Sequence, residues 1–341
     1  MSAPAQPDAQ AIRCDAQWHF HDLDPEQRTA NLLQLSEADY RQLSFLDQRA
    51  EPFASARAEL SLQDLEQALA EAESASATAH FIFHHGHCGS TLLSRALAAT
   101  DKVLPVREPL TLRRLAGPEV PRNLLKLAVK AHSRSFHPGQ VVVVKATSIC
   151  NSLIQPMLAD NLNSRAIMIF VPLESFLAGM LGKQTPALDL QGHAAHRLKE
   201  WNRISGAPGL IPEHLSEAQL AVLAWLTSMN LMLNAAEAFP ASSLLLNFED
   251  LLAKPEASLS EGASLIGLEA QLDTILAAWP DISTGYSKKP DEPYSAFNRR
   301  KTLQRGRMLR SDEIQQGLRW AKKLISATDS SSALPGLLQT H

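Results

Sequence analysis

The segment spanning residues 80–100 constrains this chain most, because it joins a short apolar run, a glycine-containing turn and the start of a helix. Gly86 and Gly89 let the turn bend tightly and bring its backbone close to a ligand. Ser90 and Thr91 open an apolar-periodic stretch, where they can cap a helix and present hydroxyl groups. The N–H groups and the positive dipole end of such a helix attract negative groups. The segment therefore predicts a loop that holds a donor bearing phosphate or sulfate.

The overall composition indicates a globular protein without a nucleic-acid partner. The 341 residues are 45% hydrophobic, enough for one large core or two modest ones, and the formal net charge is -4. No apolar run approaches the length of a membrane span, and the first ten residues lack the basic and apolar regions of a signal peptide. Cys14, Cys88 and Cys150 are too few and too scattered for a disulfide framework. We therefore expect a cytoplasmic location.

The N-terminal part of the chain differs in pattern from the rest. Residues 1–12 are predicted to be a disordered tail, and residues 13–78 a helical extension of the main domain, which spans residues 79–341. Three helix-start patterns, each followed by leucines at helical spacing, support this extension: they begin at Asp24, Ser36 and Ser61.

From residue 79 onward, short apolar runs alternate with helical patterns. The expected strands are residues 81–83, 103–106, 141–144, 166–171 and 244–246. The expected helices between them are residues 91–100, 121–132, 149–159, 173–181 and 216–239. This alternation predicts an α/β fold, a three-layer α/β/α domain with a central parallel sheet. Ligands of such sheets bind at the carboxyl ends of the strands.

Residues 185–212 interrupt the alternation with three basic residues, two histidines and a tryptophan. An insertion of this length in an α/β domain is often a lid or a substrate-binding element, and equally often a plain surface excursion. Both interpretations remain open from the sequence.

The loop does not fit the nucleoside-triphosphate pattern G-x-x-x-x-G-K-[ST]. When Gly89 and Thr91 are aligned with it, His84 stands at the first glycine and Ser90 at the lysine. Magnesium-dependent phosphoryl transfer also needs a carboxylate near the metal, yet the strong strand at 141–144 is followed by Lys145. The sequence thus disfavours an ATP or GTP enzyme.

Several segments resemble the sulfotransferase family, in the family's order, between His80 and Leu268. The loop at His87–Thr91, with the strand before it and the helix after it, resembles the family's succession of strand, loop and helix. Arg107-Glu108-Pro109 follows the second strand, where several sulfotransferases place a catalytic glutamate. The matching segments are His87-Cys88-Gly89-Ser90-Thr91, Val144-Lys145-Ala146-Thr147, Phe248-Glu249-Asp250-Leu251-Leu252 with Lys254-Pro255, and Leu265-Ile266-Gly267-Leu268.

This resemblance implies a P-loop-containing domain that moves a sulfuryl group from 3'-phosphoadenosine 5'-phosphosulfate (PAPS) to a hydroxyl or amine of a small-molecule, glycan or lipid acceptor. Glu108 would be the base for the acceptor, and His87 or Lys145 would supply positive charge, without a metal. Alternatively, Glu108 is an exposed carboxylate paired with Arg107. The residues expected to bind the donor's phosphosulfate are Gly86, His87, Cys88, Gly89, Ser90 and Thr91.

The chain departs from the family pattern at the donor's 3'-phosphate. The family has an arginine two residues before the fourth-strand proline and a serine six residues after it, where this chain has Phe170 and Ala178. His87 also replaces the loop's usual arginine or lysine, and histidine carries charge only when protonated. A basic tract lies where the family has a basic, glycine-containing loop, and it either holds the nucleotide or is a solvated surface: Arg299, Arg300, Lys301, Arg305 and Arg307.

Two other functions stay open. A small-molecule kinase would use the same loop for phosphoryl transfer, and a non-catalytic nucleotide-binding module would have kept the fold and lost the 3'-phosphate site. A metal site of clustered histidines is disfavoured, because neighbouring histidines on a strand point to opposite faces. Catalysis by Cys88 is disfavoured because this residue stands in for the family's serine.

Overall fold

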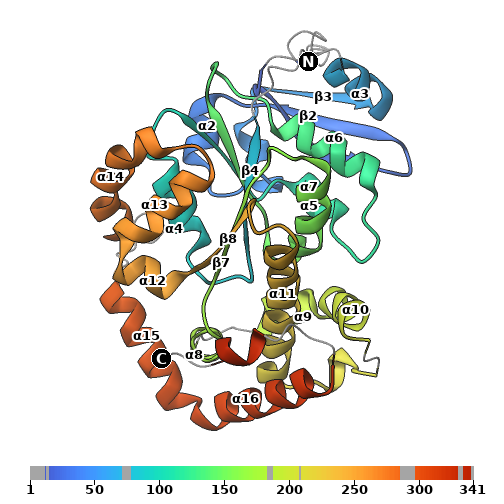
Figure 1. The fold of residues 1–341 in the computed structure, drawn as a ribbon. Helices are drawn as coiled ribbons and strands as arrows, with labels where there is room; N and C mark the ends of the chain where they lie inside the picture. The colour runs from blue at the N-terminus through green and yellow to red at the C-terminus, as the bar shows by residue number, and fades with distance from the viewer. Residues whose placement is uncertain are drawn as a thin grey trace.

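The computed structural model describes residues 12, 15–70, 78–182, 187–206, 209–284, 296–328 and 333–338. A five-stranded parallel sheet in the order β5-β6-β4-β7-β8 forms the centre (Figure 1), and a three-stranded antiparallel sheet in the order β1-β2-β3 precedes it in the chain. The strands are β1 (Trp18–Asp24), β2 (Thr29–Gln34), β3 (Ala56–Ser61), β4 (Ala79–His84), β5 (Val103–Arg107), β6 (Val141–Lys145), β7 (Ala166–Phe170) and β8 (Ser243–Asn247).

Helices cover both faces of the central sheet, which gives the predicted three layers. Figure 1 shows α4, α13 and α14 on one side of this sheet and α7 and α11 on the other. The α-helices are α2 (Glu37–Gln42), α3 (Leu62–Ala70), α4 (Ser90–Leu97), α5 (Leu110–Leu115), α6 (Arg122–His132), α7 (Ile154–Asp160), α8 (Leu173–Leu181), α9 (Ala187–Gly192), α10 (Ala194–Ser205), α11 (Glu217–Ala238), α12 (Phe248–Ala253), α13 (Pro255–Leu265), α14 (Leu272–Thr284), α15 (Ala296–Leu309) and α16 (Ser311–Ser326). The 3-10 helices are η1 (Gln48–Phe53), η2 (Ser148–Leu153), η3 (Pro212–His214), η4 (Glu269–Gln271) and η5 (Leu334–Leu337).

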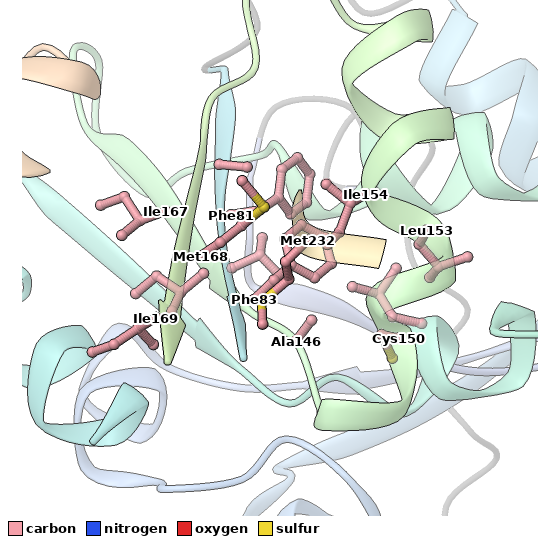
Figure 2. Close-up of a cluster of buried hydrophobic side chains, with 14 of the residues drawn as sticks. Phe81, Phe83, Ala146, Cys150, Leu153, Ile154, Ile167, Met168, Ile169 and Met232 are labelled. Carbon is pink, nitrogen blue, oxygen red and sulfur yellow. The ribbon is translucent and has the colours of Figure 1, made fainter. Parts of the chain in front are cut away.

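The five expected strands of the α/β domain are confirmed as β4 to β8. Strand β4 lies in the middle, where Phe81 pairs with Val144 of β6 and Ala166 of β7, and all of its residues are buried. A strand covered on both faces needs a continuous apolar run, which explains why these segments were recognisable in the sequence. Figure 2 shows part of the core on one face, where β4, β7, η2, α7 and α11 contribute Phe81, Phe83, Met168, Cys150, Leu153, Ile154 and Met232.

The N-terminal extension is not wholly helical, so this part of the prediction is wrong. Asp24 begins a turn instead of a helix, because its Oδ1 accepts hydrogen bonds from the N–H groups of Glu26 and Gln27. Arg28 then adopts a left-handed conformation with φ of 55°, and the chain returns as β2. An aspartate whose side chain bonds to the following N–H groups serves either a helix start or a turn, so the local pattern did not distinguish them.

The other two helix starts are correct. Ser36 caps α2 through a capping box with Asp39, and α3 begins at Leu62 directly after Ser61. Except for Ile12, the tail predicted for residues 1–12 lies outside the described residues. Within the described part of the chain, no helix is both long and apolar enough to cross a membrane.

The insertion is partly helical, and the basic tract differs in form from its expectation. The described parts of the insertion at 185–212 contain the helices α9 and α10 and the short η3. The basic tract that was compared with a loop is helix α15 from residue 296 onward. Its Gly306 packs on α8 so closely that an added Cβ would lie 2.1 Å from the carbonyl oxygen of Ala178. This close helix contact fixes where the basic side chains of α15 lie.

Candidate functional site

The glycine-containing loop between β4 and α4 has the tight geometry that its sequence predicts. Gly86, His87 and Gly89 have positive φ values of 94°, 53° and 77°. Gly89 also lacks room for a side chain, since an added Cβ would lie 2.1 Å from the ring of Phe248. The loop therefore requires glycine at position 89 for two independent reasons, its backbone conformation and the aromatic ring above it.

Two histidines at the end of β4 hold the loop through its backbone. His84 Nδ1 accepts a hydrogen bond from the Gly86 N–H at 2.9 Å, and His85 Nε2 accepts one from the Val171 N–H at 2.9 Å. Burial lowers the pKa of His85 to about 3, so this ring is neutral and can accept at Nε2. These side chains serve the architecture of the loop. Among the described residues, no group of three or more histidine, cysteine or acidic side chains is placed to hold a metal ion.

His87 and Cys88 have different surroundings within the loop. The side chain of Cys88 is fully buried and its thiol donates to the carbonyl oxygen of Ile169, with a sulfur–oxygen distance of 3.2 Å. Burial raises the pKa of this thiol to about 12, which keeps it protonated and unreactive as a nucleophile. Cys88 can thus offer only its backbone N–H to an anion. His87, in contrast, is exposed at the turn.

The start of α4 contributes hydroxyl groups at the loop. Ser90 and Thr91 form its first turn and are each 5% exposed. One turn later, the Oγ of Ser94 accepts a hydrogen bond from Arg107 Nε at 3.2 Å. Arg107 is buried and donates its Nη1 hydrogens to the carbonyl oxygens of Tyr40, Arg41 and Leu43, so it fixes the end of β5 against the helix start and the N-terminal segment.

Glu108 pairs with Lys145 rather than with Arg107, which corrects the alternative interpretation of this carboxylate. Glu108 Oε1 contacts Lys145 Nζ, and the backbone N–H of Glu108 donates to the carbonyl oxygen of Lys145 at 2.6 Å. The Lys145 side chain is 1% exposed and that of Glu108 13%. Arg107 and Lys145 are opposite each other in the register of β5 and β6. Glu108 directly follows β5, so this register brings its carboxylate beside the Lys145 ammonium group.

The structure brings one residue of the basic tract to the loop. The Arg299 guanidinium lies 4.8 Å from the centre of the Phe248 ring, the same ring that covers Gly89. Arg299 Nη2 also lies 3.7 Å from Glu249 Oε1, and its side chain is only 13% exposed. Arg300 and Lys301 are exposed on α15, and Arg307 pairs with Glu174 of α8 at 3.0 Å. Of these cations, Arg299 is therefore the one whose guanidinium lies over Phe248, the ring that packs on Gly89.

The two departures from the family pattern lie in the core. Phe170 ends β7 and is 5% exposed, and Ala178 of α8 is fully buried against Gly306. Ser148, which no sequence motif indicated, lies beside the glycine loop: it begins η2, and its Oγ is 3.7 Å from the position of a Cβ added to Gly86. Its only sequence signal is its place directly after the Lys-Ala-Thr ending of β6.

No protein-family profile matches the chain, and no match was found among curated proteins. Comparison with solved structures finds sulfotransferases. A sulfotransferase domain of the curacin biosynthetic pathway is 16% identical, with a TM-score of 0.40 over 72% of this chain and 98% of that domain. A mouse sulfotransferase complexed with PAP is 11% identical, with a TM-score of 0.38 over 76% of this chain and 87% of that one. A sulfotransferase from Alicyclobacillus acidocaldarius is 12% identical, with a TM-score of 0.34 over 76% of this chain and 98% of that one.

Proposed function

We propose that this protein is a sulfotransferase that uses PAPS as its donor. The observation that carries the proposal is the Glu108–Lys145 pair, held at the ends of β5 and β6 at the same sheet edge as the glycine loop. A carboxylate and an ammonium group beside an anion-binding loop supply a base for the acceptor and a positive charge for the leaving phosphate. The chain's motifs, in the family's order, point to the same reaction.

The residues have distinct tasks in this reaction. The N–H groups of the loop and the hydroxyls of Ser90 and Thr91 bind the phosphosulfate. Glu108 takes the proton of the acceptor's hydroxyl while the acceptor's oxygen bonds to sulfur. At the same time the bond between sulfur and the phosphate oxygen of the donor breaks. Lys145 stabilises the charge that develops on the released adenosine 3',5'-bisphosphate (PAP). Arg299, stacked over Phe248, is the candidate contact for the donor's nucleotide part.

Thermal unfolding with different nucleotides tests the donor assignment. PAP and PAPS are expected to raise the melting temperature, because a ligand at about 100 times its Kd stabilises the native state by about 2.7 kcal/mol. Mg-ATP at the same concentration is expected to have little effect. Stabilisation by Mg-ATP alone would instead identify a phosphotransferase. If no nucleotide changes the melting temperature, the chain has no site for a nucleotide donor.

A specific observation also favours a second candidate, a nucleotide-binding module without transfer activity. Phe170 and Ala178 are buried apolar residues where the family has polar contacts to the 3'-phosphate. If PAP binds no more tightly than adenosine 5'-phosphate, and PAPS is never consumed with any of a broad set of alcohols and amines, this second function is the correct one.

A further inference from the structure

A pocket of about 370 Å³ lies on the N-terminal sheet, outside the loop already described. Strands β1, β2 and β3, helix η1 and the first residue of α5 form it. Its apolar lining comes from Leu32, Leu33, Ala58 and Leu110, and its polar lining from His21, Asp22, Asn31, Gln48, Glu51, Arg57 and Glu59. The pocket thus combines an apolar surface with charged groups, which suits a small amphipathic molecule.

The charges of this pocket favour a cation. Three carboxylates line it against one guanidinium. Arg57 pairs with Glu51 at 3.0 Å, and Arg114, outside the lining, pairs with Asp22 at 3.0 Å. Glu59 is exposed opposite Asn31 in the register of β2 and β3, and no described residue forms an ion pair with it. A ligand with an ammonium group would complement Glu59, the lining carboxylate that has no paired cation among the described residues.

His21 supplies a second, independent indication of the ligand. This residue is 5% exposed, and its Nε2 lies 3.5 Å from Glu51 Oε1. A ring proton on Nε2 points toward that carboxylate, which leaves Nδ1 as a hydrogen-bond acceptor. Nδ1 is screened from solvent and has no hydrogen-bond partner among the described residues. Burial lowers the pKa of His21, which favours the neutral ring. The ring lines the pocket with an unused acceptor, Nδ1, and an N–H donor would satisfy this atom.

The pocket adjoins the candidate base. Leu110 lines it and follows Glu108 by two residues, a stretch of chain that spans at most about 7 Å. The chain before η1 is also fixed at this strand end, because the Leu46 N–H donates to the Arg107 carbonyl oxygen at 2.6 Å. The backbone of Leu110, at one end of the pocket, therefore lies within about 7 Å of the backbone of Glu108.

We propose that this pocket binds a small amphipathic molecule carrying a primary amine and a hydroxyl group, and that this molecule is the acceptor. Its ammonium group lies among Glu59, Glu51 and His21, its apolar body lies on the leucines, and its hydroxyl is presented to Glu108. Only the role as acceptor rests on the proposed function, since binding to the pocket does not depend on a donor.

Three probes that share six carbons and one hydroxyl separate the charge of the ligand from its apolar body: 6-aminohexan-1-ol, hexan-1-ol and 6-hydroxyhexanoate. Their binding to the full chain without nucleotide is followed by NMR titration, with the ring signals of His21 as the reporter. The amino alcohol is expected to bind most tightly and the hydroxy acid most weakly. Glu59→Gln should weaken amino-alcohol binding about threefold and Glu59→Lys about tenfold. Glu66→Gln, at an exposed glutamate of α3 outside the pocket, is the matched control and should change nothing.

Equal affinity for the three probes, unmoved His21 signals, or the same loss in Glu59→Gln and Glu66→Gln would each overturn the proposal. The failure of the proposed function is distinguishable from these results. If the amino alcohol binds as expected and PAP does not bind at all, the pocket is a binding site and the sulfotransferase assignment is wrong. If both bind and the amino alcohol is not consumed with PAPS, its role as acceptor is refuted.

Discussion

The ring of Phe248 lies where a side chain on Gly89 would begin, with the added Cβ only 2.1 Å from the ring. The same ring carries the guanidinium of Arg299 on its face, 4.8 Å from its centre. One aromatic side chain thus couples the glycine-containing loop to helix α15, which lies some 200 residues later in the sequence. The predictions below follow from this contact, from the Glu108–Lys145 pair and from the buried histidines.

Replacing Gly89 by alanine should lower the free energy of unfolding by more than backbone strain alone would. Gly139→Ala is a matched control, because Gly139 has a similar φ of 74° and no atom within 4 Å of an added Cβ. We expect Gly139→Ala to lower the free energy of unfolding by about 1 kcal/mol. Gly89→Ala should cost about 1–3 kcal/mol more, through the clash with Phe248. Urea unfolding of both variants measures this, and equal losses would contradict the proposed steric role of the ring.

Arg299→Ala should weaken the binding of PAP by about tenfold, since a charge-assisted contact to phosphate contributes about 1.4 kcal/mol or more. Arg300→Ala, at an exposed neighbour on the same helix, should leave binding unchanged. Calorimetric titration with PAP and with adenosine 5'-phosphate shows which phosphate is involved. A loss confined to PAP assigns Arg299 to the 3'-phosphate, and no loss with either ligand removes Arg299 from the site.

Glu108→Gln should abolish the consumption of PAPS while PAP binding stays intact. The amide keeps the shape of the carboxylate and an oxygen for Lys145, yet it cannot accept the acceptor's proton. The release of PAP from PAPS, with an acceptor that the unmodified chain uses, is the measurement. Turnover at the original rate would exclude Glu108 as the base.

Lys145→Met should lower the free energy of unfolding by about 3 kcal/mol, because it leaves the Glu108 carboxylate largely buried without its cation. Adding Glu108→Gln to this variant should restore part of the loss, since the remaining partner is then uncharged. A double-mutant cycle from urea unfolding provides the coupling energy. Additive effects of the two substitutions would show that the pair contributes nothing to stability.

Acidification should destabilise the fold through histidines that are buried in the neutral form. Burial lowers the pKa of His85 and His132 to about 3, whereas an unfolded histidine titrates near 6.5. Between these values only the unfolded state gains the proton, so stability is full above about pH 6.5 and falls as the pH decreases toward about 3. Each residue accounts for about 1.4 kcal/mol per pH unit well inside this window.

Substitution of His132 tests this pH dependence. In His132→Gln the slope of unfolding free energy between about pH 5.5 and 4 should decrease by about 1.4 kcal/mol per pH unit. His214→Gln, at an exposed histidine of η3, serves as the control and should leave the slope unchanged. An unaltered slope in the His132 variant would mean that this ring is protonated in the native state.

The strands of the central sheet were predictable because each contains a short apolar run between turn residues, a local property of the sequence. The hairpin of β1 and β2 was missed, although Trp18 and Phe20 alternate with polar residues, the period of a strand. The structure buries the intervening His19 and His21 as well. The turn at Asp24 has the residues of a helix start, and only the pairing of β2 with both of its neighbours decides in favour of a strand.

The shape of the loop was predictable from local residues, because glycines at positions 86 and 89 and the hydroxyl residues at the start of α4 act through backbone conformation. The sequence also identified Glu108 and Lys145 as candidates by their places after two strands. Which charged side chains meet depends instead on how the elements pack. Arg107 bonds to carbonyl groups while Glu108 pairs with Lys145, and Arg299 reaches the loop while Arg300 does not. Such choices depend on strand register and on the close contact of Gly306 with α8, distances through space that no local pattern encodes.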